Sequence, residues 1–380
     1  MAAPLGLSEE QRALLDLVKD IARREIAPHV DEWERDAVFP RPAFDALGKA
    51  GLLGLVYPEE YGGGAQPNAV YLLVLEELAS ALLSVGLGAS VQTLTIFPTH
   101  AYGTAEQKAR WMPPACAGEW IGAYCLSEPG SGSDASALVT KAEREGDSWV
   151  INGRKAFVTH GGEADYYQVL ARTGEAGPAG ISCFFVPADT PGVTREKLEH
   201  KMGMRSSPTA AMLFDGVRVP EGHLIGEPGV GFRIAMQALD GGRLGIAACS
   251  VGLARAALDA AVTFAREREA FRKPIIDFQG ISFMLADMAT QIDAARALTQ
   301  EAGRRRDAGE PFATQAAMAK LFASDTAMRV TTDAVQVHGG YGYVEEFPVE
   351  RYMREAKVLQ IVEGTNQIQR LVIGRSLGRD

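Results

Sequence analysis

Cysteine is scarce in this sequence, and its spacing does not suggest a cross-linked or metal-bound protein. The 380 residues include only four cysteines, Cys116, Cys125, Cys183 and Cys249, which lie far apart and form no CxxC pair. A disulfide framework or a zinc site is therefore not expected, and a reducing compartment fits this usage. We expect each cysteine to be a small buried hydrophobic residue.

Positive charge, leader segments and long apolar runs are also scarce. The formal net charge is −10, so the protein as a whole does not attract nucleic acid. The N-terminus turns acidic at once and has neither a signal-peptide core nor an Arg-rich transit pattern. No uninterrupted apolar run reaches membrane-spanning length. We therefore expect a cytoplasmic, bacterial protein with no membrane span and no nucleic-acid partner.

The apolar pattern divides the chain into three regions and predicts an α+β multidomain fold. Residues 1–121 show helical spacing. Residues 122–232 contain short runs rich in β-branched and aromatic residues, which predict about seven or eight strands. Residues 233–380 return to helical spacing. Four helices are predicted in this last region, over 244–268, 278–306, 313–337 and after Glu363.

The segment from Gln360 to Arg370 contains the first candidate for catalysis. Glu363 follows an apolar pair and precedes Gly364, a glycine that frees the backbone to turn. Thr365 is expected to cap the following helix. A carboxylate held in such a bend has the fixed orientation that a general base needs. The alternative is a surface glutamate in an ordinary turn between helices, and this segment alone favours that alternative.

Five other segments combine glycine, hydroxyl, aromatic or basic residues in patterns that suit a flat or anionic ligand. In each, a plain loop, strand or turn explains the same residues, and no strand leads into a Gly-rich helix start as in a Rossmann fold. The nearby His160 and His338 lack catalytic or metal-ligand spacing, so we expect no metal. The segments are Tyr124–Asp134, Arg154–Gly162, Asp240–Arg243 (expected to open a helix), Arg268–Pro274 with Gln279, and Gln336–Gly340.

Together and in this order, these segments resemble those of the acyl-CoA dehydrogenase family, nearly end to end. Cys125–Asp134 matches one family signature, and the run from Gln336 through Lys357 matches the other. Pro58–Gly63 and Lys201–Arg205 are also typical of the family. The segment from Gln237 to Asp287 is most similar to the short-chain, butyryl-type branch.

The resemblance implies an N-terminal helical domain, a central β-barrel-like domain and a C-terminal four-helix bundle, with FAD between the last two. It implies α,β-dehydrogenation of a short- or medium-chain acyl-CoA to the trans-2-enoyl-CoA, as in fatty acid β-oxidation. Glu363 would remove the α-proton while a hydride passes to flavin N5. The family is usually a homotetramer, a dimer of dimers in which a neighbouring subunit completes each adenine site. Electron transfer flavoprotein usually reoxidises the flavin.

The resemblance also assigns residues. Glu363 is the base, and Ser133, Asp240, Arg243 and Gly364 contact the acyl-CoA. Some branches carry the base directly before the arginine that corresponds to Arg243, but Gly242 stands there. The implied FAD contacts are Tyr124, Leu126, Ser127, Gly132, Ser133, Phe157, Val158, Thr159, Arg268, Phe271, Gln279, Gln336, Val337, Gly339, Gly340, Thr365, Asn366 and Gln367.

The chain departs from the family pattern near the expected adenine site. Arg272 replaces the usual glycine and Ala270 a polar residue, so Arg272 either adds a pyrophosphate contact or loosens the usual turn. Two other functions stay open. One is an oxidase of the same fold that uses oxygen, and the other is a flavin-bearing binding protein without catalysis, which the acidic charge and Glu363 disfavour. Within the dehydrogenase reaction, branched short-chain, aromatic, and steroid or polyketide side-chain thioesters stay open beside the short- or medium-chain acyl group.

Overall fold

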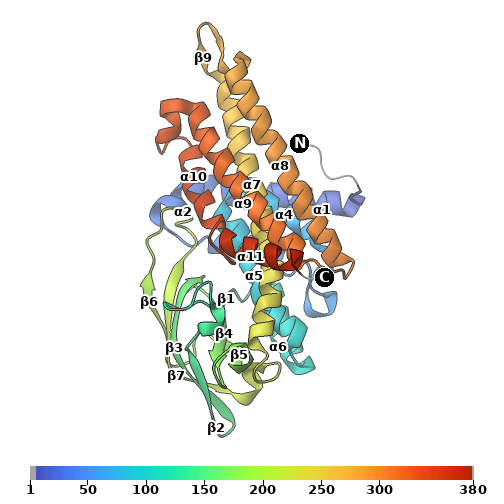
Figure 1. Ribbon diagram of the computed structural model, residues 1–380, viewed down its shortest axis with the longest axis vertical. Coiled ribbons are helices and arrows are strands. Elements are labelled where there is room, and N and C mark those ends of the chain that lie inside the picture. Colours follow the sequence, from blue (N-terminus) through green and yellow to red (C-terminus); the bar gives the residue numbers. More distant parts are fainter. Residues whose placement is uncertain (1–5, 379–380) are drawn as a thin grey trace.

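The computed structural model describes residues 6–378, in which long helices pack beside and above one β-sheet (Figure 1). The N-terminal region is helical, and α4 and α5 are apolar and buried around most of their circumference. Such helices belong in the centre of a protein rather than on its surface. The six helices of this region are α1 (Glu9–Ile21), α2 (Val30–Asp36), α3 (Arg41–Lys49), α4 (Asn68–Ala81), α5 (Leu83–Tyr102) and α6 (Ala105–Cys116).

The middle of the chain forms an eight-stranded sheet, in agreement with the predicted strands. Its order is β6-β7-β3-β2-β4-β5-β8, and β1 pairs with β4 in parallel. One face has its own apolar core, and the other packs on the helices, where Trp111 of α6 stacks on Phe185 at 4.2 Å. The strands are β1 (Gly122–Cys125), β2 (Lys141–Glu145), β3 (Ser148–Thr159), β4 (Tyr166–Arg172), β5 (Ile181–Pro187), β6 (Val193–Leu198), β7 (Thr209–Pro220) and β8 (Leu224–Ile225).

The C-terminal region corrects two sequence-based expectations. Asp240–Arg243 does not open a helix, because α7 begins at Gly231 and runs through both glycines to Glu267. A further helix, α10, was not predicted because its residues were read only as part of a Gly-rich signature. The helices are α7 (Gly231–Glu267), α8 (Gln279–Asp307), α9 (Ala313–His338), α10 (Val349–Leu359) and α11 (Asn366–Leu377), with a small hairpin of β9 (Glu269–Ala270) and β10 (Lys273–Pro274) between α7 and α8.

Helix α7 is the element that joins the regions. It packs against α4, α5, α8 and α9, and its N-terminal part also contacts β5 (Figure 1). Within residues 6–378, α7 is the one helix long and apolar enough to cross a membrane, which the absence of a long apolar run in the sequence did not predict. However, 72% of its most apolar window is buried within the protein. Its apolar surface is therefore the core of the fold. The four cysteines are free and buried, as predicted.

Candidate active site

Glu363 lies in the turn between α10 and α11, in a backbone conformation that a side-chain-bearing residue rarely adopts. Its φ is +51° and that of Gly364 is +89°. Thr365 caps α11, as predicted, by accepting a hydrogen bond from the Ile368 N–H at 3.4 Å. A non-glycine residue with positive φ costs energy and persists only where its surroundings hold it. The turn is therefore built to hold one particular side-chain direction.

Two buried side chains hold this turn through hydrogen bonds to its backbone carbonyl groups. Gln369 Nε2 donates to the carbonyl oxygens of Glu363 at 3.2 Å and Gly364 at 2.8 Å. Lys320 Nζ, on α9 and fully buried, donates to Gly364 O at 3.0 Å and to Asn366 Oδ1 at 2.8 Å. Asn366 in turn donates to Asp325 Oδ1 at 2.7 Å. These bonds fix the backbone on both sides of the carboxylate.

Glu363 is half-buried, and its carboxylate Oε2 is buried next to α7, within electrostatic range of the cations Arg243 and Lys320. Burial raises its pKa from the ordinary 4.5 to about 7, although the nearby Arg243 and Lys320 lower it. A Cβ atom built on Gly242 would lie only 1.8 Å from Glu363 Oε2, so the carboxylate occupies the space that a side chain at 242 would take. A carboxyl group with a pKa near neutrality suits proton abstraction at physiological pH.

Three polar atoms around this centre are buried without a hydrogen-bond partner. They are Glu363 Oε2, Arg243 Nε and the Tyr124 hydroxyl oxygen. The pKa of Tyr124 is raised by burial and by the charges of Cys183 and Glu363, which places its hydroxyl within electrostatic range of the carboxylate. Buried polar atoms are nearly always paired, so unpaired ones mark a place where a ligand supplies the partner.

Arg243 is buried on α7 beside Asp240. Its side chain is 7% exposed and its Nη1 donates to Asp240 Oδ1 at 2.5 Å. Burial raises the pKa of Asp240, while Arg243 and Arg306 lower it. Arg243 also lowers the pKa of Glu363, so its charge supports the ionised carboxylate. The contacts of Asp240 and Arg243 with CoA stay predictions.

The predicted flavin-facing segments do come together at the edge of β3. Ala156 N–H donates to Ser127 O at 2.9 Å, which joins the Tyr124–Ser133 segment to the strand. Beside this contact Phe157 has φ +54° and leaves 71% of its surface exposed, while Val158 is buried. Open space surrounds the Cα hydrogens of Gly130 and Gly132. An exposed ring beside open glycine backbone fits the face of a flat heterocycle such as the flavin.

A buried ion pair supports this segment. Lys155 Nζ lies 2.7 Å from Glu128 Oε1, with the two side chains 0% and 2% exposed. Glu128 also accepts the backbone N–H groups of Val139 at 2.6 Å and Thr140 at 3.0 Å. Both residues stood within the segments singled out in the sequence, but nothing in the sequence pattern paired them.

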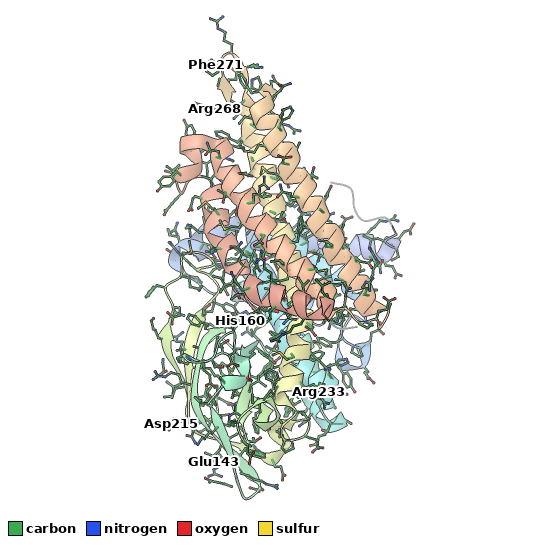
Figure 2. All side chains as sticks on the ribbon, in the orientation of Figure 1. Glu143, His160, Asp215, Arg233, Arg268 and Phe271 are labelled. Carbon is green, nitrogen blue, oxygen red and sulfur yellow. The ribbon has the colours of Figure 1, made fainter. Side chains whose placement is uncertain are left out.

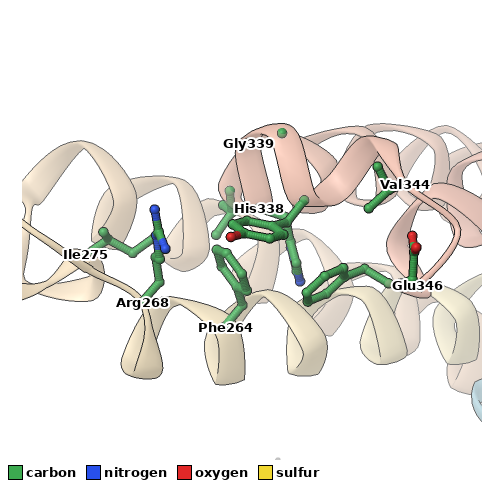
Figure 3. A pocket seen from close by; sticks show the side chains of 11 residues that line it. Phe264, Arg268, Ile275, His338, Gly339, Val344 and Glu346 are labelled. Carbon is green, nitrogen blue, oxygen red and sulfur yellow. The ribbon is translucent and has the colours of Figure 1, made fainter.

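A second group of predicted contacts lies at the far end of the bundle. Arg268, Val337, Gly339 and Gly340 line a groove of about 730 Å³, in which His338 stacks on Phe264 at 4.3 Å (Figure 3). The His338 Nδ1–H donates to Ala334 O at 2.8 Å, which identifies a structural histidine. The groove has aromatic faces, a guanidinium and open glycine backbone, a combination that fits an adenine ring and a pyrophosphate.

The two groups do not form one site within a single chain. Gly242 and Arg268 lie at opposite parts of α7, about 39 Å apart along its axis. Arg268 and Phe271 are at the upper tip in Figure 2, and Phe271 is 90% exposed on the β9–β10 hairpin. Gln279 opens α8 close to that hairpin. Arg268, Phe271 and Gln279 thus lie at the tip, away from Glu363. Thr365, Asn366 and Gln367, which are also expected at the pyrophosphate and adenosine, instead directly follow Glu363 at the start of α11.

Reasoning from sequence missed the residues that support Glu363 from other helices. Lys320 is the clearest case, because a lysine within the apolar run Ala316–Ala323 signals a buried charge that needs partners. Gln369 stands on the first turns of α11 and carried no distinguishing pattern. His160 is buried with its Nδ1–H donated to Gly122 O at 3.0 Å, in agreement with its predicted structural role.

Comparison with known proteins agrees with this geometry. Models of the acyl-CoA dehydrogenase N-terminal, middle and C-terminal domains match residues 8–119, 123–217 and 229–378. The mitochondrial short-chain specific acyl-CoA dehydrogenase of Mus musculus is 44% identical over 375 residues, covering 98% of this chain and 91% of that protein.

Solved structures show the same likeness. The butyryl-CoA dehydrogenase of Megasphaera elsdenii is 42% identical with a TM-score of 0.97, over 99% of this chain and 100% of that one. A chain described with the electron transferring flavoprotein of Acidaminococcus fermentans is 45% identical with a TM-score of 0.97, over 100% of both chains.

The chain therefore belongs to the acyl-CoA dehydrogenase family and has its three-domain fold, helical, β-sheet and helical. Members of this family are FAD-dependent. The protein is an acyl-CoA dehydrogenase, an oxidoreductase that acts on an acyl-CoA.

Proposed function

We propose that the protein dehydrogenates a short-chain acyl-CoA to the trans-2-enoyl-CoA, with Glu363 as the base that removes the α-proton. The observation that supports this most directly is the Glu363 carboxylate itself. Its Oε2 is buried without a hydrogen-bond partner, and its pKa is raised to about 7. The likeness to short-chain and butyryl-CoA dehydrogenases supports a short acyl chain.

The surrounding residues would prepare Glu363 for a weakly acidic carbon. Burial raises its pKa and strengthens it as a base, while Arg243 and Lys320 keep an ionised fraction available. Gln369 and Lys320 hold the backbone of the turn, so the carboxylate reaches the α-carbon from one fixed direction. Gly242 keeps the space beside α7 open for that carboxylate.

FAD, when bound, supplies the acceptor for the hydride that leaves the β-carbon. Tyr124–Ser133, Phe157 and Thr159 would hold its ring beside Glu363, and the groove of Arg268, Val337, Gly339 and Gly340 would hold the adenine end of a second FAD. Because the two groups lie far apart on α7, a homotetramer would complete each FAD site from neighbouring chains. We propose electron transfer flavoprotein as the acceptor and the cytoplasm as the compartment.

The test is anaerobic bleaching of the bound flavin across a panel of straight-chain acyl-CoA thioesters. Wild-type protein should bleach fastest with a four-carbon to six-carbon chain. Glu363→Gln should bind the thioesters and retain FAD but bleach slower by about 10⁴-fold, the upper range of a general base. Glu106→Gln, which changes an exposed glutamate on α6, is the matched control and should behave as wild type.

Two results would contradict the proposal. Unchanged bleaching by Glu363→Gln would remove Glu363 as the base. Rapid peroxide formation when the reduced protein is mixed with air in a stopped-flow instrument would favour an oxidase of the same fold.

A further inference from the structure

Helix α10 connects the two parts of the candidate site, because the Arg268 groove lies at its start and the Glu363 turn follows its end. Phe347 lines that groove, α10 begins at Val349 and ends at Leu359, and the turn comes next. The helix packs on α7 and α9 through the apolar core, to which Val349 and Leu359 belong. A displacement of α10 would therefore move the turn that carries the carboxylate.

The loop between β6 and β7 also lies against α10, in direct backbone contact. A Cβ atom built on Gly203 would lie 2.8 Å from Glu355 N and 2.9 Å from Arg354 C, so only a glycine permits this approach. Arg354 Nη1 donates to Met202 O in the same loop. The Nε and Nη2 atoms of this guanidinium donate to Glu350 at 2.7 Å and 2.8 Å. The loop is thus fixed to α10 at Glu355.

The same loop is bound to the N-terminal region by Glu34, a buried residue of α2. Its carboxylate accepts the backbone N–H groups of Arg205 at 2.8 Å and Ser206 at 3.1 Å. It also accepts the hydroxyl groups of Ser206 and, at 2.9 Å, of Ser84 at the start of α5. An ionised carboxylate only accepts hydrogen bonds, so this set of donors fits the charged form. Glu34 therefore brings one negative charge to the junction of α2, the loop and α10.

Glu355 is a second buried carboxyl group at this junction, and its surroundings differ from those of Glu34. Its side chain is 1% exposed, and its Oε1 has no hydrogen-bond partner. Arg351 Nε approaches that oxygen only to 3.9 Å, which is too long for a hydrogen bond, and this Nε is also unpartnered. Burial raises the pKa of Glu355 to about 8 against the effect of Arg351, and the charge of Glu34 adds to the increase.

The other charged groups around the two carboxyls have partners elsewhere or lie toward solvent. Lys201, whose ammonium faces Glu34 from the loop, donates to a backbone carbonyl of that loop at 2.6 Å. Arg351 Nη1 lies 3.7 Å from Asp31, which is exposed on α2. A buried carboxyl group without strong donors is more stable neutral than charged. The geometry therefore favours a protonated Glu355 beside an ionised Glu34.

We propose that Glu34 and Glu355 form a carboxyl pair that keeps one negative charge, with Glu355 protonated, and that in this state positions α10 and the turn that carries Glu363. Both are positioning residues, because they act through α10 rather than on the thioester. Ionisation of Glu355 would place two like charges in a buried junction and weaken the contact between the loop and α10. The effect on Glu363 rests on the proposed function, whereas the pair itself does not.

The experiment compares holoenzyme of the wild type, Glu355→Gln, Glu34→Gln and the double variant. Glu32→Gln is the matched control, because it changes an exposed glutamate on the same helix as Glu34. A glutamine at 355 has the shape of the protonated carboxyl group and does not titrate. Denaturant unfolding measures stability from pH 5 to pH 9, and anaerobic flavin bleaching by butyryl-CoA measures the rate over the same range.

The folded state holds the Glu355 proton more tightly than the unfolded chain does, so its contribution is lost as pH rises to about 8. Relative to Glu355→Gln, the folding equilibrium constant of the wild type should fall at least about tenfold between pH 5 and pH 8, by no more than about tenfold per pH unit, and then level off. Glu363 is present in both proteins, so its own titration cancels. Glu32→Gln should follow the wild type throughout.

The variants of Glu34 test whether the two carboxyl groups act as a pair. Glu34→Gln should be less stable than the wild type at every pH, because it loses an acceptor of buried donors. The comparison of Glu34→Gln with the double variant should level off at a lower pH than that of the wild type with Glu355→Gln, because the like charge that raises the pKa of Glu355 is gone.

The bleaching rate tests the positioning of Glu363. Above about pH 8 the wild-type rate should fall from its plateau as Glu355 ionises, and Glu355→Gln should keep the plateau to pH 9. A measurement that needs no substitution at 355 is infrared difference spectroscopy of Glu363→Gln between pH 6 and pH 9, which should show a protonated carboxyl group that titrates near pH 8.

Three outcomes would overturn the inference. Parallel stability curves for the wild type and Glu355→Gln, or no titrating carboxyl band near pH 8, would show that Glu355 holds no proton. An unshifted levelling point in the Glu34→Gln background would show that the two carboxyls are not a pair. Identical alkaline rate profiles for the wild type and Glu355→Gln would remove the positioning of Glu363. A wild type that butyryl-CoA does not bleach would contradict the proposed function instead, and the stability curves would still decide the pair.

Discussion

The Glu363 carboxylate rests on the bare backbone of Gly242, in the place that a side chain at 242 would occupy. A Cβ atom there would approach Oε2 to 1.8 Å and Oε1 to 2.9 Å. Helix α7 therefore lies so close to the turn before α11 that any side chain at position 242 would displace the Glu363 carboxylate. The glycine lies inside a helix, where it is intrinsically unfavourable by about 1 kcal/mol relative to alanine. Its presence is explained by the neighbouring carboxylate rather than by helix stability.

Gly242→Ala should consequently lower the rate of flavin bleaching while leaving the free energy of unfolding nearly unchanged. The added methyl group improves helix propensity and meets only the flexible end of a side chain, so unfolding free energy should change by less than about 1 kcal/mol. The carboxylate must move, and a misplacement of about 1 Å costs about 10²-fold in rate. Thermal unfolding and anaerobic flavin bleaching check the two effects.

Gly374→Ala on α11 is the control, because nothing lies near the Cβ atom that it adds. It should leave the bleaching rate unchanged. If Gly242→Ala were as active as wild type, the observed direction of the Glu363 carboxylate would not be the catalytic one.

The raised pKa of Glu363 predicts the pH dependence of the reaction. Because the base must be ionised, kcat/KM should rise about tenfold per pH unit below pH 7 and level off above it. Stability should follow the opposite direction. The folded pKa lies above the ordinary 4.5, so the folded state holds this proton more tightly, and the contribution is complete below pH 4.5 and is lost as pH rises to about 7.

Glu363→Gln should remove this stability component, since a glutamine does not titrate. Denaturant unfolding of both proteins between pH 5 and pH 8 measures the difference, which should increasingly favour the variant up to about pH 7 and then level off. A kcat/KM profile with no inflection between about pH 6 and pH 8 would contradict the assignment of a buried base with this pKa.

Lys320→Met should move the inflection of kcat/KM upward. Lys320 lowers the pKa of Glu363, so its removal should raise that pKa further above 7. Gly364 O and Asn366 Oδ1 also lose their donor, which should lower stability. Lys49→Met changes an exposed lysine on α3 and is the control. A uniform loss of rate with an unmoved inflection would limit Lys320 to a structural role.

The sequence was informative where a signature is local and uninformative where a contact joins distant elements. The bend at Glu363, its glycine and the Thr365 cap depend on adjacent residues, so they were predictable and are confirmed. The strands predicted for the middle region are likewise confirmed. Two consecutive glycines, however, suggested a helix start, whereas packing against Glu363 and Arg306 explains why α7 tolerates them inside.

The contacts that tune the site could not be predicted for the same reason. Lys320 reaches Gly364 from 44 residues away, and Lys155 reaches Glu128 from 27 residues away. Local spacing carries no information about such pairs. The separation of Glu363 from the Arg268 groove also depends on the length and straightness of α7, which the two glycines concealed.

Lys155→Met should destabilise the protein strongly because it leaves a buried carboxylate unpaired. Breaking a buried ion pair in this way costs about 3–5 kcal/mol. The segment that Glu128 anchors through Val139 and Thr140 should loosen, so FAD should dissociate more readily. Denaturant unfolding and the fraction of FAD retained on gel filtration measure both effects.

The double variant Lys155→Met with Glu128→Gln should recover part of the lost stability, since it removes the unpaired charge and its amide oxygen can still accept one of the two backbone N–H groups. If the double variant were less stable than Lys155→Met, the cost would come from packing rather than from the uncompensated charge of Glu128.

Arg272→Gly should stabilise the β9–β10 hairpin at the tip of the bundle. Phe271 and Arg272 form its two-residue turn with φ of +50° and +69°, so the turn stays tight even though Arg272 stands where the family usually has glycine. An L-residue in this conformation costs about 1–2 kcal/mol, which glycine does not pay. Because the turn of the hairpin is exposed, its local stability is best measured by amide hydrogen exchange at Ile275, whose N–H donates to Arg268 O at 2.8 Å. Exchange there should slow about fivefold or more in Arg272→Gly and stay unchanged in Phe271→Ala, which keeps both residues non-glycine.

Unchanged exchange in Arg272→Gly would show that this turn is not strained. A simultaneous loss of bound FAD would show that the Arg272 guanidinium contributes a contact that glycine cannot replace.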